Sequence, residues 1–256
     1  MENERKIKMK HITASMLVIG DEILSGRTKD KNIGWLAEKL KLLNIQFLEA
    51  RIIADNKMEI KKNILELSHK HTYVFTSGGI GPTHDDITTE SIAEAFDRKV
   101  KTNKIALEKL EQHYKNTNLE FNKYRRKMAK IPEGSDLIEN PVSIAPGFKL
   151  NNVFVMAGVP LIFQSMFNSF SDNLVGGDRK YSANLKCYVG EGTIASILTE
   201  INNQFTEISI GSYPWFKPGN FGTSLVITGF NKLMVEEVKE HILNRLSLEK
   251  FKVEIN

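Results

Sequence analysis

Apolar residues in the first two-thirds of the chain form short continuous runs, each with the length of a buried strand. These runs are 14–19, 73–76 and 153–157, and a further strand is predicted over about 45–53. Between them, apolar residues recur every three or four positions, the spacing of a helix with one buried face. Such helices are predicted over 32–43, from the Asn56/Glu59 capping pair onward, around 92–96 and after Pro160. Alternating strands and helices predict a doubly wound, mostly parallel α/β sheet with helices on both faces.

A different pattern follows the turn-rich segment SDNLVGGDRK at 171–180, which we interpret as a linker. The predicted elements beyond it are a strand at 183–189, a helix at 194–201, strands near 207–213 and 223–230, a helix at 235–242 and the alternating end FKVEI. Their order, βαββαβ, is typical of a smaller ferredoxin-like α+β domain. The sequence therefore predicts two domains, 12–172 and 180–256.

Composition places the chain among ordinary globular proteins. Its 256 residues are 41% hydrophobic and 26% charged, with a net charge of +4, which excludes disordered and collagen-like classes. Cys187 is the single cysteine, so neither an intrachain disulfide nor a cysteine zinc cluster can form. No apolar run approaches the roughly 20 residues of a membrane helix, and the charged N-terminal segment lacks a signal-peptide core. We expect a cytoplasmic protein with no membrane partner.

Glycine or aspartate follows three of the predicted strands, at Gly20, Asp55 and Gly78. The carboxyl ends of parallel strands lie at one edge of a sheet, where α/β proteins bind ligands. We therefore expect these three residues to converge on one site. For Asp55 an equally direct interpretation is that it caps the next helix.

The segment TSGGIGPTHDDIT, residues 76–88, is the richest in candidate chemistry. Backbone amides of a glycine-rich loop ahead of a helix suit a phosphate group. The candidate binding residues of this loop are Ser77, Gly78, Gly79, Gly81 and Thr83. Asp85 and Asp86 come next, and two carboxylates beside a phosphate require a metal ion. The alternative is a tight turn in which an aspartate caps the following helix.

The segment GDEILSGRT, residues 20–28, superficially resembles a phosphate-binding P-loop. Five residues separate its glycines instead of four, and Arg27 stands where that motif has lysine. Gly20, Asp21 and Glu22 instead suit a metal ion or a sugar hydroxyl. A plain strand-to-helix loop is the alternative.

Positive charge is concentrated between Arg98 and Lys130, where eleven Lys or Arg accompany three Glu. Arg125 or Arg126 is the residue that we expect to reach a phosphate, because a guanidinium binds one bidentately. A solvated helical face is the alternative. Nucleic acid is not an expected partner, since the segment lacks aromatic residues spaced for base stacking.

Five motifs, in the same order, resemble the MoaB/Mog molybdopterin-binding family and, within it, the N-terminal part of CinA proteins. They are GDEILSGRTKDKN, TSGGIGPTHDDIT, the AxxP of 129–132, NPVSIAPGF and AGVP, across roughly residues 13–170. The remainder, with IGSYP, is similar to the continuation in CinA-type proteins and in the molybdopterin-binding half of eukaryotic FAD synthase. The resemblance implies a MogA-like fold, and it adds to the candidate substrate-binding residues Pro146, Gly147, Gly158 and Pro160.

The resemblance also implies an enzyme, a pyrophosphatase that hydrolyses an ADP-ribose- or FAD-type dinucleotide with Mg²⁺, Mn²⁺ or Co²⁺ and with K⁺. In this hypothesis the glycine loop binds the diphosphate, and Asp86, with Asp85 and Asp55, holds the metal and forms the catalytic group. Arg125 or Arg126 offsets charge on the leaving phosphate.

The alternative is a non-catalytic module for a small phosphorylated nucleotide or pterin, or a protein like the adenylyltransferase of molybdopterin biosynthesis. Members of the fold commonly self-associate, which implies a homo-oligomer. This sequence departs from the family pattern at Ser143, where members carry glycine, at Ala157, where they carry proline, and at Ile162 and Phe163, where they carry a Glu-Met pair.

Overall fold

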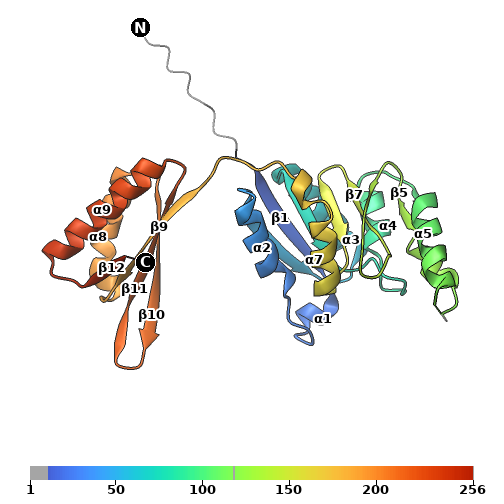
Figure 1. Ribbon diagram of the computed structural model, residues 1–256, viewed down its shortest axis with the longest axis horizontal. Helices are drawn as coiled ribbons and strands as arrows, with labels where there is room; N and C mark the ends of the chain where they lie inside the picture. Colours follow the sequence, from blue (N-terminus) through green and yellow to red (C-terminus); the bar gives the residue numbers. More distant parts are fainter. Residues whose placement is uncertain (1–10, 118, 256) are drawn as a thin grey trace, which may run out of the picture. The chain divides into compact units, whose positions relative to one another are not determined.

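The chain divides into two compact units, of which the first ends at Gly177 and the second begins at Asp178 (Figure 1). A computed structural model describes residues 11–117 and 119–255. The expectation about targeting signals concerns residues 1–10, which lie outside the described residues. None of the helices in the described part of the chain is long and apolar enough to cross a bilayer.

A six-stranded mixed sheet forms the centre of the first unit. In spatial order its strands are β2 (Gln46–Ile53), β1 (Thr13–Ile19), β3 (Tyr73–Ser77), β8 (Val153–Met156), β7 (Gly147–Leu150) and β6 (Asp136–Ile138). The first four are parallel, while β7 pairs antiparallel with β8 and with β6. The predicted doubly wound, mostly parallel architecture is confirmed. The sequence did not predict β6 and β7, which are too short for a period of two to be recognised.

Two helices cover each face of this sheet (Figure 1). They are α2 (Asn32–Leu42) and α7 (Pro160–Asn168) on one face, and α3 (Lys57–Lys70) and α4 (Thr88–Ala95) on the other. Because side chains of a strand alternate between faces, Met16 and Val18 pack in the cluster of α2 and α7, whereas Leu17 and Ile19 pack in that of α3 and α4. Every residue of β1 after Thr13 is buried, which explains why its sequence is a continuous apolar run.

Asn56 caps α3, as predicted, by accepting hydrogen bonds from the amides of Met58 and Glu59. The reciprocal bond expected from Glu59 does not form. The amide of Asn56 donates instead to the carbonyl of Ala54, at 2.7 Å. One half of the capping box is sufficient here, because the side-chain oxygen already satisfies two free amides of the first turn.

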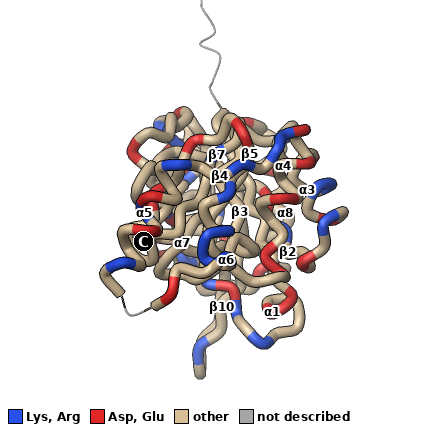
Figure 2. Tube along the Cα trace, turned by 90° about the vertical axis from the view of Figure 1, so that its right-hand side faces the viewer, with Lys and Arg blue, Asp and Glu red and all other residues tan. Residues whose placement is uncertain are grey.

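A small helical subdomain is inserted between α4 and β6. It consists of α5 (Lys104–Lys115), α6 (Lys123–Lys127) and a two-stranded sheet of β4 (Val100–Thr102) and β5 (Lys130–Pro132). Its own buried core is Ala106, Leu110 and Ala129. The basic residues of α6 are drawn in blue beside its label in Figure 2.

The second unit has the predicted βαββαβ order. Its elements are β9 (Tyr181–Cys187), α8 (Glu191–Gln204), β10 (Ser209–Lys217), β11 (Asn220–Gly229), α9 (Lys232–Leu248) and β12 (Val253–Ile255). The antiparallel sheet order β10-β11-β9-β12 confirms the ferredoxin-like prediction. Trp215 packs edge-on against Tyr188, but Phe216 is 80% exposed because it lies near the tip of the β10–β11 hairpin.

An ionic cluster attaches β2 to α3 on the surface of the first unit. Glu49 of β2 contacts the Lys70 ammonium at 2.6 Å and the Arg51 guanidinium at 2.7 Å. Arg51 also bonds Glu66 of α3 at 2.7 Å, and the buried His71 ring lies 3.3 Å from Glu49. Hydrogen bonds from Lys70, then Arg51, lower the pKa of Glu49 to about 2.

This pKa predicts a loss of stability in acid. The contribution of Glu49 is fully present above its ordinary pKa of 4.5 and disappears as the pH falls toward 2, because the folded state binds that proton less readily than the unfolded state. Glu49→Gln should therefore lower the free energy of unfolding at pH 7 and flatten its decline between pH 5 and pH 2.5, measured by urea denaturation. Glu38→Gln, at an exposed position of α2, is the control, and equal effects of both variants would contradict the prediction.

Candidate active site

Four strand ends meet at a cavity of about 500 Å³ in the first unit. Gly20 follows β1, Asp55 lies just beyond β2, Gly78 follows β3 and Gly158 lies just beyond β8, and all four line this cavity. Helix α2, which connects β1 to β2, lies on one face of the sheet, and helix α3, which connects β2 to β3, lies on the other. The cavity thus lies at the topological switch point between β1 and β3, the position at which open α/β sheets bind ligands.

The backbone of the glycine loop packs directly against the end of β1. Gly78 has φ +109°, and a Cβ there would lie 2.1 Å from the carbonyl oxygen of Ile19. Gly79 has φ +68°, and its Cβ would lie 2.1 Å from the hydroxyl oxygen of Thr88. Both positions exclude a side chain by conformation and by contact. The loop therefore turns directly after β3, close to the end of β1, and its residues line the cavity.

The next two residues, Ile80 and Gly81, line the cavity and take part in no hydrogen bond within the described residues. Their backbone amides are available to a bound anion. Thr83 closes the loop, since its amide donates to Asp86 Oδ2 at 2.8 Å and its hydroxyl donates to the same oxygen. Asp86 thus stabilises the conformation of the loop and also lines the cavity.

Negative charge accumulates beside these amides. Glu22, Asp55, Asp85 and Asp86 all line the cavity. The pKa of Asp55 is raised, first by burial and then by the repulsion of Asp21, Glu22 and Asp85. The bond that Asp55 accepts from the Asp21 amide, at 3.0 Å, only partly offsets this effect. The carboxylates therefore form a cluster whose charge no lysine or arginine of the cavity lining neutralises.

This cluster fits a divalent cation in one particular way. Within residues 11–117 and 119–255, no three acidic, histidine or cysteine side chains converge closely enough to hold a metal ion by themselves. Mg²⁺, however, is commonly held by one or two carboxylates, with phosphate oxygens and waters completing its six ligands. Glu22 and Asp55 could supply the protein ligands of such an ion beside a bound phosphate.

The cation that does reach the loop from the basic segment is Lys127. Its ammonium donates to the carbonyls of Asp86, at 2.8 Å, and Thr83, at 3.3 Å. Arg125 lies over the ring of Tyr114 and donates to the Glu120 carbonyl. The sequence singled out the arginines, because a guanidinium binds phosphate bidentately, and missed the lysine that follows them.

Arg126 is likewise held away from the cavity, by Glu111 at 2.8 Å and by the ring of Phe121. The structure brings neither arginine to the cavity lining. The rings that the two guanidinium groups cover, Tyr114 and Phe121, pack against the small core of this subdomain, which the sequence could not reveal because it depends on how the helices pack. The positions of both side chains therefore favour a structural role.

The other predicted residues lie around the cavity in supporting positions. Ser77 and Pro160 line an adjoining cavity of about 260 Å³ that shares Glu22 and Gly158 with the first. Gly147 allows β7 to approach β8, since a Cβ would lie 2.2 Å from the Val155 carbonyl oxygen. Pro146 lies at the edge of a further cavity beside α5.

Asn32 is a supporting residue that sequence reasoning missed. It is buried at the start of α2, and its amide donates to the Ser77 hydroxyl at 2.9 Å and to the Gly158 carbonyl at 2.8 Å. These bonds connect α2 to the ends of β3 and β8. A polar residue at the first position of a helix ordinarily indicates a cap, so the pattern gave no signal of this longer-range role.

The comparisons with known proteins agree with this architecture. A family model described as a probable molybdopterin binding domain matches residues 15–175, and one described as the FAD synthase middle domain matches residues 179–254. The chain belongs to the molybdopterin-binding domain family. The resemblance inferred from its motifs is thereby confirmed, and its second unit is homologous to the FAD synthase middle domain.

Relatives of this chain include proteins of similar and of greater length. A protein of Archaeoglobus fulgidus is 32% identical over 227 residues, which are 89% of this chain and 93% of that protein. A probable FAD synthase of Caenorhabditis elegans is 31% identical over 239 residues, 84% of this chain but 46% of that protein. The chain thus spans about half the length of that relative.

A solved structure shares the fold of the molybdopterin-binding unit. The crystal structure of CinA from Thermoplasma acidophilum, described as a protein of unknown function, has a TM-score of 0.59 and 30% identity, covering 64% of this chain and 98% of that one. Three of the four positions at which this sequence departs from the family pattern, Ser143, Ala157 and Ile162, line the cavity of about 500 Å³, whereas Phe163 is buried in the core. The departures are therefore concentrated where a ligand would be in contact.

The contact between Gly78 and Ile19 predicts the effect of a single methyl group. Gly78→Ala should lower the free energy of unfolding by more than about 3 kcal/mol, or prevent folding, because it combines a positive φ with a clash against backbone. Gly26→Ala is the matched control: φ is +75° there, but nothing lies within 4 Å of the added atom. It should cost about 1 kcal/mol. Equal losses in thermal denaturation would show that the close approach is unimportant.

Lys127 is predicted to hold the loop in place. Lys127→Met should accelerate amide hydrogen exchange at Thr83 and Thr88, whose amides donate hydrogen bonds within the loop, because two charge-assisted hydrogen bonds from Lys127 to the loop are lost. Lys123→Met is the control, since Lys123 lies over the ring of Tyr124 in the same helix. Exchange rates that stay the same in both variants would contradict this role.

Proposed function

We propose that this protein is a metal-dependent nucleotide pyrophosphatase that acts on a dinucleotide of the ADP-ribose or FAD type. The observation that carries the proposal is the composition of the main cavity. Ile80 and Gly81, whose amides have no hydrogen-bond partner within the described residues, line it beside four carboxylates, and burial, followed by the repulsion of neighbouring acids, raises the pKa of Asp55. A diphosphate with a divalent cation suits such a cavity, because phosphate oxygens accept hydrogen bonds from the amides and the cation neutralises the carboxylates.

Each group has a defined role in this proposal. The amides of Ile80 and Gly81 bind oxygens of the diphosphate, and Glu22 and Asp55 hold the cation. When bound, the cation supplies charge neutralisation and lowers the pKa of a water molecule. Water attacks one phosphorus, the bridging P–O bond breaks, and the bridging oxygen leaves with the second phosphate. The products are two phosphate monoesters, one of which is AMP.

Asp86 has a different role from the one that the sequence suggested. Thr83 already donates two hydrogen bonds to Asp86 Oδ2, so that oxygen maintains the loop. The proposal therefore assigns the cation to Glu22 and Asp55 and treats Asp86 as the residue that keeps the amides of Ile80 and Gly81 at the cavity wall.

The relatives give independent support for the substrate class. One of them is named a probable FAD synthase, and the family model that matches the second unit describes the middle domain of FAD synthase. FAD is a dinucleotide with a pyrophosphate bridge. This homology supports a site that binds the pyrophosphate bridge of a dinucleotide.

The test is release of AMP from ADP-ribose, FAD and NAD in the presence of Mg²⁺, Mn²⁺ or Co²⁺ with K⁺. We expect metal-dependent turnover of at least one substrate and a loss on the order of 100-fold or more in Asp55→Asn, because the variant keeps the acceptor for the Asp21 amide but removes the charge. Asp97→Asn is the control, since Asp97 is exposed and does not line the cavity.

Two results would overturn the proposal. Turnover that persists in Asp55→Asn would show that the Asp55 carboxylate does not hold the cation. Intact substrates combined with tight binding of a nucleotide or a phosphorylated pterin would instead identify a binding module, or a protein that acts in molybdopterin biosynthesis.

A further inference from the structure

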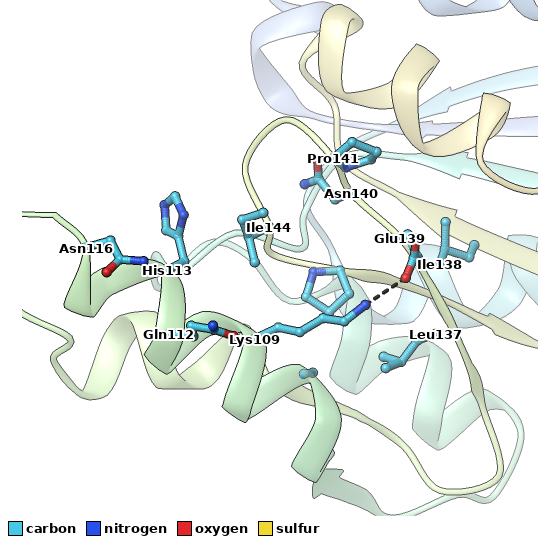
Figure 3. A pocket seen from close by; sticks show the side chains of 12 residues that line it. Lys109, Gln112, His113, Asn116, Leu137, Ile138, Glu139, Asn140, Pro141 and Ile144 are labelled. Carbon is cyan, nitrogen blue, oxygen red and sulfur yellow. Dashed lines mark hydrogen bonds and ion pairs between the residues drawn. The ribbon is translucent and has the colours of Figure 1, made fainter.

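A second cavity, of about 400 Å³, lies between α5 and the segment that follows β6. Figure 3 shows Gln112 and His113 on α5, and Asn116 directly after it, facing Asn140, Pro141 and Ile144 across the space. Its volume lies within the range of about 300–1,000 Å³ that is usual for small-molecule sites. The proposed hydrolysis at the main cavity makes no use of it.

The chemistry of this cavity favours an uncharged, flat ligand. Its inner surface is apolar and consists of Ala106, Leu137, Ile138, Pro141, Ile144 and Pro146. The one pair of charges, Lys109 and Glu139, is joined at 2.7 Å and leaves no net charge for a phosphate (Figure 3). The remaining rim carries the amides of Gln112 and Asn116 and the imidazole of His113, groups that can donate and accept hydrogen bonds at the edge of a ring.

The second cavity adjoins the main one through a shared wall. Asn140 lines both cavities, with Ser143 and Ala145 on the main side and Ile144 on the other. Asn140 braces this wall by donating to Ser143 Oγ at 2.6 Å and to the Ala145 carbonyl at 2.8 Å. The two cavities thus lie on opposite sides of one short segment of the chain.

Ile144 adopts an unusual backbone conformation at this wall. Its φ is +65°, a region that is rare for a β-branched residue and costs free energy. Its amide donates to the carbonyl of Asn140 at 3.0 Å, which helps to hold the turn. The turn directs Ile144 toward the second cavity while its neighbours line the first. The strained conformation thus builds the apolar surface of the second cavity.

We propose that the cavity between α5 and residues 137–146 binds a heterocyclic base of the dinucleotide whose diphosphate occupies the main cavity. This inference rests on the proposed function for the identity of the ligand. A base presents two apolar faces to the inner surface and polar ring atoms to the rim amides, and it carries no charge that would need a partner. The second cavity would thereby select dinucleotides over simple polyphosphates.

The test uses the full chain with adenosine and with riboflavin, two phosphate-free base compounds (here called nucleosides), which need neither metal nor turnover. Methyl NMR should show shifts at Ile138 and Ile144 on addition of at least one nucleoside, with no shift at Ile105, which is exposed and does not line the cavity. Gln112→Trp should fill the cavity from an exposed helical position and weaken nucleoside binding on the order of tenfold. Lys115→Trp, exposed on the same helix, is the matched control.

The outcomes separate this inference from the proposed function. Nucleoside binding at Ile144 without any hydrolysis would support the inference and refute the pyrophosphatase. Hydrolysis with an unchanged KM in Gln112→Trp, or nucleoside shifts confined to Ile19 and Ile80 of the main cavity, would overturn the inference and leave the pyrophosphatase intact. A thermal melting curve of Gln112→Trp that matches the native curve shows that the fold is retained.

Discussion

The contact between the glycine loop and the end of β1 determines much of the first unit. Gly78 lies against the Ile19 carbonyl. On the other side, a Cβ added to Gly158 would lie 3.4 Å from the Gly78 Cα. Three strand ends thus meet with no side chain between them. This proximity leaves the amides of the loop at the cavity wall, and it brings the acidic residues that follow β1 and β2 beside the same space. A bulkier residue at this point would separate the strands or displace the loop.

Electrostatics gives the cavity its chemical character. Burial, and then the repulsion of carboxylates from different elements, raises the pKa of Asp55, and this uncompensated negative charge has a cost for the folded protein. At the second group of acids, around Glu49, the pKa is lowered instead. Lys70 and Arg51 neutralise the Glu49 carboxylate and lower its pKa to about 2. The contrast separates the two clusters. The first lacks a cationic side chain in its cavity lining and suits an external cation, whereas the second is a structural connection between a strand and a helix.

The helical subdomain of α5 and α6 extends the site beyond the sheet. Its small core holds Arg125 and Arg126 in structural contacts, and it leaves Lys127 free to bond the loop at Thr83 and Asp86. The same subdomain forms one side of the second cavity, while the wall at Asn140–Ile144 forms the other. A single segment of 137–146 therefore separates a cavity that is acidic and lined with amides from one that is apolar and nearly neutral. Such a division matches a ligand with a charged centre and an uncharged end.

The sequence by itself determined the alternation of strands and helices, the two domains and the glycine loop, because apolar spacing and turn residues are local signals. It also brought Gly20, Asp55 and Gly78 to one edge, since parallel strands end together. The tertiary structure alone decided which basic residue reaches the loop, that Thr83 occupies an oxygen of Asp86, that Asn32 joins α2 to two strand ends, and that β6 and β7 extend the sheet. These features depend on contacts between residues far apart in the chain, and neither periodicity nor residue type specifies which of several similar side chains will meet a given partner.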